Sequence, residues 1–210
     1  MIKLHHLEYS RSTRIIWLLE ELGVEYEMVR HQRHPETMRA QADLAAIHPL
    51  AKAPTVIIDD HLMMESGAVI EYILEQYGEG KLAPVPGSKD RAEYLEWLHF
   101  AEGTLANPVI VQMLAPRFGG LGEGYAPFVE GEVVKLLDYV EHHIDNREFL
   151  VGDGFTGADI NVMYVLELAL AAGMLANRPA SMDYAKRMMA RAAYKKAIEL
   201  GGPIVPSLAG

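Results

Sequence analysis

Residues 52–66 read KAPTVIIDDHLMMES, and this stretch decides the fold of the first third of the chain. Pro54 stands before a run of β-branched residues, and a proline is tolerated at the first position of a strand. Asp59-Asp60 is typical of a tight turn, so residues 54–58 and 61–64 are expected to form a hairpin. Ser66 then supplies a hydroxyl of the kind that opens a helix. The stretch therefore predicts a loop, a hairpin and a helix start in succession.

The two ends of this stretch also have the chemistry of a binding site. A cis peptide bond before Pro54 would turn the backbone so that Ala53 presents its N–H and C=O outward to an extended peptide. Pro54 read alone could equally be an ordinary loop proline. The helix start favours a site, because free N–H groups and the Ser66 hydroxyl bind a carboxylate and Glu65 can take an ammonium group. Together these groups match an amino-acid head group.

Upstream, the sequence predicts a strand, a helix and a second strand. Residues 2–7 and 26–30 are apolar-rich and strand-like, and residues 32–46 read as a loop with a short helix. Gly23 stands where a helix end favours a left-handed residue. The helix that it ends has one apolar face, formed by Ile15, Leu18, Leu19 and Leu22. The order is β-α-β-α followed by the hairpin and a helix from Ser66.

Beyond residue 78 the pattern changes from strands to helices. Residues 79–88 contain several glycines and prolines and read as a linker. Helical patterns follow at 90–113, 129–146, 158–172 and 182–200. The sequence therefore predicts two domains, an α/β domain at 1–78 and an all-helical domain at 89–210. The helix at 158–172 is apolar nearly all round, so it is expected at the centre of the second domain.

Composition excludes several classes of function. The formal net charge is −10, which disfavours nucleic acid and anionic membrane surfaces as partners. The sequence has no cysteine, which excludes disulfides, thiolate metal sites and a cysteine nucleophile. The start of the chain lacks the pattern of a signal peptide, and no apolar run approaches the ~20 residues of a membrane helix. We expect a soluble, cytoplasmic protein.

Two weaker motifs have structural interpretations. Residues 152–157 fit G-x-G-x-x-G, but the βαβ unit and acidic residue of a dinucleotide site do not follow. Thr156 is better read as the N-cap of a helix, with Asp159 reaching back in a capping box. The nine histidines show no metal-ligand spacing, so no metal site is expected.

Several motifs, taken in order, resemble the cytosolic glutathione S-transferase family. They are the S-x-x-x-R pattern of Ser10 to Arg14, residues 17–23 (WLLEELG), Lys52-Ala53-Pro54, Glu65-Ser66 and residues 155–160 (FTGADI). The resemblance covers nearly the whole chain and is strongest over residues 1–78 and 148–172. Within the family, the chain is most similar to bacterial and fungal serine-type members.

This resemblance implies a thioredoxin-like N-terminal domain, an all-α C-terminal domain and glutathione as co-substrate. It implies that Ala53 pairs with the cysteinyl backbone of glutathione beside a cis Pro54. Glu65 and Ser66 would hold the γ-glutamyl end, and Lys52 would neutralise the glycyl carboxylate. The family is also dimeric, so a homodimer is expected.

The chemistry needs a group that stabilises the glutathione thiolate. By the S-x-x-x-R pattern this group is the hydroxyl of Ser10, acting as a hydrogen-bond donor because serine is too weak a base to remove the proton. Ser12 and Tyr9 remain the alternatives, and Ser12 is also expected to be the N-cap of the first helix.

A small hydrophobic electrophile is expected against apolar side chains of the first long helix after the linker. The candidates are Asn107, Val111, Met113 and Phe118, together with the tail around Ile204. The predicted activity is transfer of glutathione to electrophiles or reduction of peroxides. The alternatives are a glutathione-dependent isomerase of the maleylacetoacetate type and a non-catalytic carrier or adaptor. The isomerase branch carries serine-cysteine-serine where this chain has Ser10-Arg11-Ser12, which disfavours it.

Overall fold

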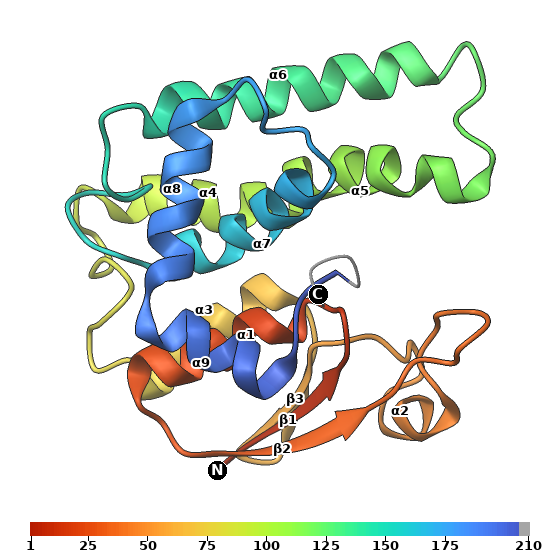
Figure 1. The fold of residues 1–210 in the computed structure, drawn as a ribbon. Helices are drawn as coiled ribbons and strands as arrows, with labels where there is room; N and C mark the ends of the chain where they lie inside the picture. Colours follow the sequence, from red (N-terminus) through yellow and green to blue (C-terminus); the bar gives the residue numbers. More distant parts are fainter. Residues whose placement is uncertain (206–210) are drawn as a thin grey trace. The chain divides into compact units, whose positions relative to one another are not determined.

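The structure is a computed structural model that describes residues 1–205. Its contacts divide the chain into two compact units, one of Met1–Lys81 together with the chain from Ala190 onward, and one of Leu82–Met189. The first is an α/β unit and the second is helical (Figure 1). The predicted fold class, a thioredoxin-like domain followed by a helical domain, is confirmed.

The α/β unit is built on a four-stranded mixed sheet. Its strands are β1 (Ile2–Leu7), β2 (Tyr26–His31), β3 (Thr55–Ile58) and β4 (His61–Met63), in the order β2-β1-β3-β4. β1 runs parallel to β2 and antiparallel to β3, and β4 runs antiparallel to β3. Asp59 and Asp60 both have positive φ, 47° and 72°, as a two-residue hairpin turn requires. The predicted hairpin is confirmed.

Four helices belong to this unit: α1 (Ser12–Leu22), α2 (Ala42–Ile47), α3 (Ser66–Tyr77) and α9 (Ala192–Gly201). The helices α1, α3 and α9 lie together on one side of the sheet, and α2 lies apart from them near the end of β2 (Figure 1). The predicted apolar face of α1 is buried at Ile15, Leu18 and Leu19. Gly23 ends the helix in the left-handed region, with φ 68°.

The helix α9 is anchored on α1. The Arg191 guanidinium donates to both carboxylate oxygens of Glu21, at 2.6 and 2.9 Å. Trp17 donates to the same carboxylate at 2.9 Å and meets the Tyr194 ring edge-on. These contacts explain why the chain from Ala190 onward groups with the sheet, whereas the predicted helical domain ran from 89 to 210.

The helical unit begins with one long, interrupted helical run. This run comprises α4 (Arg91–Phe100), a π-helical turn η1 (Ala101–Leu105), α5 (Ala106–Leu114) and a 3₁₀ turn η2 (Ala115–Phe118). The remaining helices are α6 (Ala126–Ile144), α7 (Gly157–Ala171) and α8 (Pro179–Ala190). Nearly every side chain of α7 is buried, as predicted from its apolar sequence. Within the described residues, no helix combines the length and apolarity needed to cross a membrane.

The start of α7 is the predicted capping box. The buried Asp159 carboxylate accepts hydrogen bonds from the Thr156 N–H and hydroxyl, each at 2.8 Å. It also accepts from the Leu150 N–H at 2.9 Å and the Tyr184 hydroxyl at 2.7 Å. Because this carboxylate binds four donors from three segments, it holds the centre of the helical unit together.

Candidate functional site

Three predicted ligand-binding segments lie at one edge of the sheet. Ser10 follows the end of β1, Pro54 precedes β3 and Ser66 follows β4. His5 pairs with Thr55, so the end of β1 lies beside the start of β3. Val56 likewise pairs with Met63, which brings the end of β4 to the same place. The topology therefore gathers the three segments.

Each of the three segments contains a residue other than glycine in the positive φ region. Tyr9 precedes Ser10 with φ 51°, Ala51 precedes Lys52 with φ 48° and Glu65 precedes Ser66 with φ 68°. Such a conformation costs on the order of 1–3 kcal/mol and is enriched at functional sites. Its recurrence beside every predicted contact marks this edge as a candidate binding site.

The peptide bond between Ala53 and Pro54 is cis, as the family resemblance implied. Pro54 is buried, Ala53 is half-buried and Lys52 is exposed. The Thr55 hydroxyl donates to the Lys52 carbonyl at 2.6 Å, which fixes the backbone immediately before Ala53. The hydrogen bond before Ala53 and the cis bond after it therefore both fix the direction of the Ala53 main chain.

The start of α3 has a buried hydroxyl with nothing to bind. The Ser66 side chain is 2% exposed, and its oxygen has no hydrogen-bond partner among the residues that the structure describes. Glu65 occupies the N-cap position with its side chain exposed. An unpaired buried hydroxyl costs about 1–3 kcal/mol. A ligand carboxylate at this helix start would remove that cost.

The loop before α1 contains a connected pair of serines. The Ser10 and Ser12 oxygens lie 2.7 Å apart, and the Ser10 oxygen is also 2.7 Å from the Leu7 carbonyl oxygen. The Ser12 N–H donates to the Ser10 oxygen at 3.2 Å. The N-cap position belongs to Arg11, and Ser12 is the first helical residue, so the prediction that Ser12 caps α1 was wrong. Its hydroxyl turns inward because His6 lies 2.8 Å away.

The buried His6 connects this loop to α9. Its Nε2 lies 2.8 Å from the Gly201 carbonyl oxygen, and its Nδ1 faces the Ser12 hydroxyl. Burial lowers the pKa of His6 to about 4, so the imidazole is neutral at neutral pH. Sequence reasoning missed His6, since only the fold brings residues 6 and 201 together.

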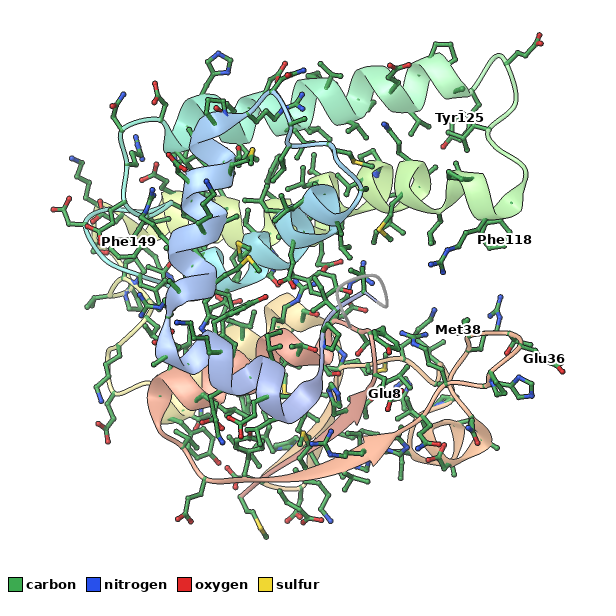
Figure 2. All side chains as sticks on the ribbon, viewed as in Figure 1. Glu8, Glu36, Met38, Phe118, Tyr125 and Phe149 are labelled. Carbon is green, nitrogen blue, oxygen red and sulfur yellow. The ribbon has the colours of Figure 1, made fainter. Side chains whose placement is uncertain are left out.

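Arg33 was also missed. Its guanidinium donates to the carbonyl oxygens of Glu8 at 2.8 Å, Tyr9 at 2.7 Å and Met38 at 2.6 Å. Figure 2 labels Glu8 and Met38 in the α/β unit. Arg33 thus braces the loop that presents Ser10. Because these three partners are backbone carbonyls, no side-chain motif could reveal this role.

Four of the predicted pocket residues, Asn107, Val111, Met113 and Phe118, belong to the helical unit. Asn107 and Val111 are one turn apart on α5 and share a face, whereas Met113 lies about 200° around the helix from Val111. Phe118 ends η2 and is 80% exposed, at the same end of the unit as Tyr125 (Figure 2). Ile204 belongs to the α/β unit. The structure therefore brings Asn107 and Val111 onto one surface and separates Met113 from it.

Comparison with known proteins finds the same family over most of the chain. Residues 1–75 match the family model of the glutathione S-transferase N-terminal domain, and residues 112–192 match that of the C-terminal domain. The chain is 34% identical to glutathione S-transferase 3 of Schizosaccharomyces pombe over 178 residues, covering 76% of this chain and 70% of that protein. It is 30% identical to a probable maleylacetoacetate isomerase of Caenorhabditis elegans, covering 73% and 70%.

Solved structures agree. A crystal structure of a glutathione S-transferase from Actinobacillus pleuropneumoniae superimposes with a TM-score of 0.90 at 29% identity, covering 100% of this chain and 97% of that one. The match to the N-terminal family model includes all three segments of the sheet edge described above. The chain therefore belongs to the glutathione S-transferase family, as a glutathione transferase whose co-substrate is glutathione.

Proposed function

We propose that this enzyme activates the glutathione thiol through a hydrogen bond from Ser10 and directs the thiolate to small hydrophobic electrophiles or peroxides. The observation that carries the proposal is that Ser10 follows the end of β1, at the same end of the sheet as the cis Ala53-Pro54 bond before β3. A thiolate seated against Ala53 would then lie at the end of the sheet where α1 starts.

A hydrogen bond from a serine hydroxyl is strong enough to stabilise the glutathione thiolate. A thiol with a pKa of ~8.5 is only a few per cent ionised at pH 7, and lowering that pKa by ~2 units needs ~2.7 kcal/mol. A hydrogen bond to a charged acceptor contributes ~1.5–3 kcal/mol, and a helix N-terminus adds ~0.3–1 kcal/mol. One serine hydroxyl at the start of α1 therefore supplies the required stabilisation.

Ser10 is favoured over both alternatives by its surroundings. The Ser12 hydroxyl is fully buried and faces the bare Nδ1 of neutral His6, which takes its hydrogen. The Tyr9 carbonyl is bound by Arg33, so the turn at Tyr9 serves to hold the loop. The Ser10 hydrogen has two alternative acceptors in the Leu7 carbonyl and the Ser12 oxygen, and it can turn from either to a sulfur.

The rest of glutathione is proposed to lie along the same edge. Its γ-glutamyl carboxylate binds the unpaired Ser66 hydroxyl and the free N–H groups of α3, and Glu65 takes its ammonium group. Its cysteinyl backbone pairs with Ala53 beside Pro54, and its glycyl carboxylate is neutralised by the exposed Lys52.

The electrophile is proposed to bind the face of α5 that includes Asn107 and Val111. Phe118 is proposed as a further contact, whereas Met113 lies on another face of α5. We propose a cytoplasmic homodimer as the working form, with a role in detoxification. Sedimentation tests the dimer, since a monomer at micromolar concentration contradicts it.

The proposed function is tested by calorimetric titration with glutathione and by conjugation of a chlorodinitrobenzene substrate. Wild-type protein is expected to bind glutathione with measurable heat. Ser10→Ala is expected to retain binding and to lose about tenfold to a hundredfold in turnover near neutral pH. Ser88→Ala removes an exposed linker hydroxyl and serves as the matched control. Near-normal turnover of Ser10→Ala would remove Ser10 from this role.

A second activity has one observation in its favour, the relative named as a probable maleylacetoacetate isomerase. Glutathione addition to a cis double bond, rotation and elimination would use the same activated thiolate. An isomerisation assay with maleylacetoacetate separates the two activities, because a transferase that lacks this activity consumes none of it.

A further inference from the structure

Ser10 does not stand alone at the start of α1, because three further groups fix its hydroxyl in a chain. The chain runs from the Gly201 carbonyl through His6 and Ser12 to Ser10, with successive contacts of 2.8, 2.8 and 2.7 Å. All three side chains are buried, with exposures of 0% for His6 and Ser12 and 6% for Ser10. The Gly201 end of this chain of contacts belongs to α9.

The direction of each hydrogen follows from elementary chemistry. A carbonyl oxygen can only accept, so His6 Nε2 carries the hydrogen and donates to Gly201. A neutral imidazole then has a bare Nδ1, which accepts the hydrogen of the Ser12 hydroxyl. With that hydrogen committed, the Ser12 oxygen can only accept from its neighbours, the Ser10 hydroxyl and the Leu7 N–H at 3.3 Å.

The Ser10 oxygen is therefore held without losing its ability to donate. It accepts the Ser12 N–H, while its own hydrogen points toward Ser12 or Leu7 and is the one mobile hydrogen of the chain. If His6 lacked its bare Nδ1, the Ser12 hydroxyl could donate to Ser10, and the Ser12 oxygen would no longer be held as an acceptor that faces the Ser10 hydrogen. The orientation of Ser12 thus decides how Ser10 meets a thiolate.

The contact at the α9 end depends on glycine. A Cβ at position 201 would lie 2.6 Å from Ile16 Cδ1 and 3.1 Å from His6 Cε1, so a side chain here would force these atoms apart. The absence of a Cβ at position 201 thus lets Ile16 and His6 pack closely where the Gly201 carbonyl reaches His6.

We propose that His6 and Ser12 are positioning residues that hold the Ser10 hydroxyl as a donor to the glutathione thiolate, anchored on the Gly201 carbonyl of α9. The inference rests on the proposed role of Ser10. A relay that carries the thiol proton to His6 is disfavoured on magnitude. A base of pKa about 4 and a thiol of pKa ~8.5 differ by ~4.5 units, so the equilibrium for this proton transfer is unfavourable by more than about 10⁴-fold.

The test titrates the thiol of glutathione bound to the full-length protein, followed by the ultraviolet absorbance of its thiolate. Wild type, Ser10→Ala, Ser12→Ala and the double variant form one cycle. Ser12→Ala is expected to raise the pKa of the bound thiol by about one unit and to lower kcat below that pKa about tenfold. The Kd for glutathione is expected to stay within about twofold, because the Ser66 end is untouched. In the Ser10→Ala background, Ser12→Ala is expected to add no further shift.

A matched pair at His6 separates positioning from packing. His6→Gln keeps one donor and one acceptor and is expected to stay near the wild-type thiol pKa, whereas His6→Leu keeps the bulk, loses both and is expected to follow Ser12→Ala. An unchanged thiol pKa in Ser12→Ala, with a shift in Ser10→Ala, would overturn the positioning role alone. No shift in Ser10→Ala would overturn the proposed serine mechanism and this inference with it. An additive shift in the double variant would mean that Ser12 acts on the sulfur directly, which also contradicts the inference.

Discussion

The starts of α3 and α7 use similar residues in opposite ways. At α3 the N-cap is Glu65 and the first helical residue is Ser66, whereas at α7 the N-cap is Thr156 and Asp159 stands at the third helical position. At α7 the Asp159 carboxylate is saturated by donors from Leu150, Thr156 and Tyr184. At α3 the Ser66 oxygen is buried and lacks a partner within the described chain, and Glu65 sits at φ 68°. The buried polar group at the start of α7 has hydrogen-bond partners, whereas the one at the start of α3 has none within the described residues.

The difference separates a polar cluster that holds the fold from one that has capacity left for binding. A saturated polar cluster stabilises the protein and has no capacity left for binding. An unsatisfied one lowers stability by an amount that a ligand can recover. Substitutions at the two helix starts should therefore affect different quantities, and the following changes test this from the largest effect to the smallest.

Replacing Asp159 with alanine removes the shared hydrogen-bond acceptor at the start of α7. Four donors lose their common acceptor inside the helical unit, so the free energy of unfolding is expected to fall by about 3–5 kcal/mol. Chemical denaturation measures this loss. Asp153→Ala, an exposed position in the preceding loop, is the control and is expected to change stability by less than about 0.5 kcal/mol. A small effect of Asp159→Ala would mean that the capping box does not hold the unit together.

Acid is expected to act with opposite sign on the two units. The pKa of His6 in the α/β unit is lowered from 6.5 to about 4, so the unfolded chain binds its proton first. The stability that this neutral imidazole contributes is present above pH 6.5 and is lost as the pH falls toward 4, by about 3 kcal/mol. Burial instead raises the pKa of Asp159, so its contribution grows as the pH falls through that raised pKa toward 3.8.

Hydrogen exchange resolved by peptide, at pH 7 and pH 5, measures this contrast. Amides of β1 and α1 are expected to lose more protection than those of α7 after correction for the intrinsic exchange rate. Burial lowers the pKa of both His5 and His6 in β1, so His6→Leu removes one of the two groups and is expected to reduce the response of β1. Equal loss in both units would contradict the assignment.

Replacing Ser66 with alanine removes the buried hydroxyl at the start of α3. Because the hydroxyl has no partner within residues 1–205, its removal is expected to leave the free energy of unfolding unchanged or slightly higher. Glutathione should lose one hydrogen bond to its carboxylate, about 1.5–3 kcal/mol, or roughly 10- to 150-fold in Kd. Calorimetry and denaturation on the same protein give both numbers. A fall in stability with unchanged affinity would make Ser66 a structural residue.

These contrasts also show where sequence reasoning succeeds. Local patterns predicted the hairpin at Asp59-Asp60, the α1 end at Gly23 and the capping box at Thr156, because each depends on residues within one turn or one helix. The position of α9 was not predicted, since its packing depends on contacts between residues far apart, such as Arg191 with Glu21.

The same limit applies to the candidate site. The motif positions of Ser10, Pro54 and Ser66 could be read from the sequence, and the cis bond at Pro54 followed from the resemblance. The supports of Ser10, namely His6 and Arg33, could not, because their key partners include backbone carbonyls brought close by folding. Ser12 was read as a cap from its residue type alone, and its buried imidazole neighbour changed its role.

Substitutions of Glu65 are expected to have the smallest effect, and they test the start of α3 directly. Glu65→Gly removes both the carboxylate and the conformational cost of a side chain at φ 68°, so the protein is expected to gain about 1 kcal/mol in stability. Glutathione binding is expected to weaken in the same variant, because the ammonium group loses its partner. Glu65→Gln keeps the strained backbone and loses only the charge, so it should weaken binding without gaining stability.

If Glu65→Gly gains no stability, the backbone of Glu65 is not strained. If it binds glutathione normally, the carboxylate does not hold the ligand. A variant that is more stable and binds less well would show that the start of α3 retains an unfavourable conformation because the ligand requires it.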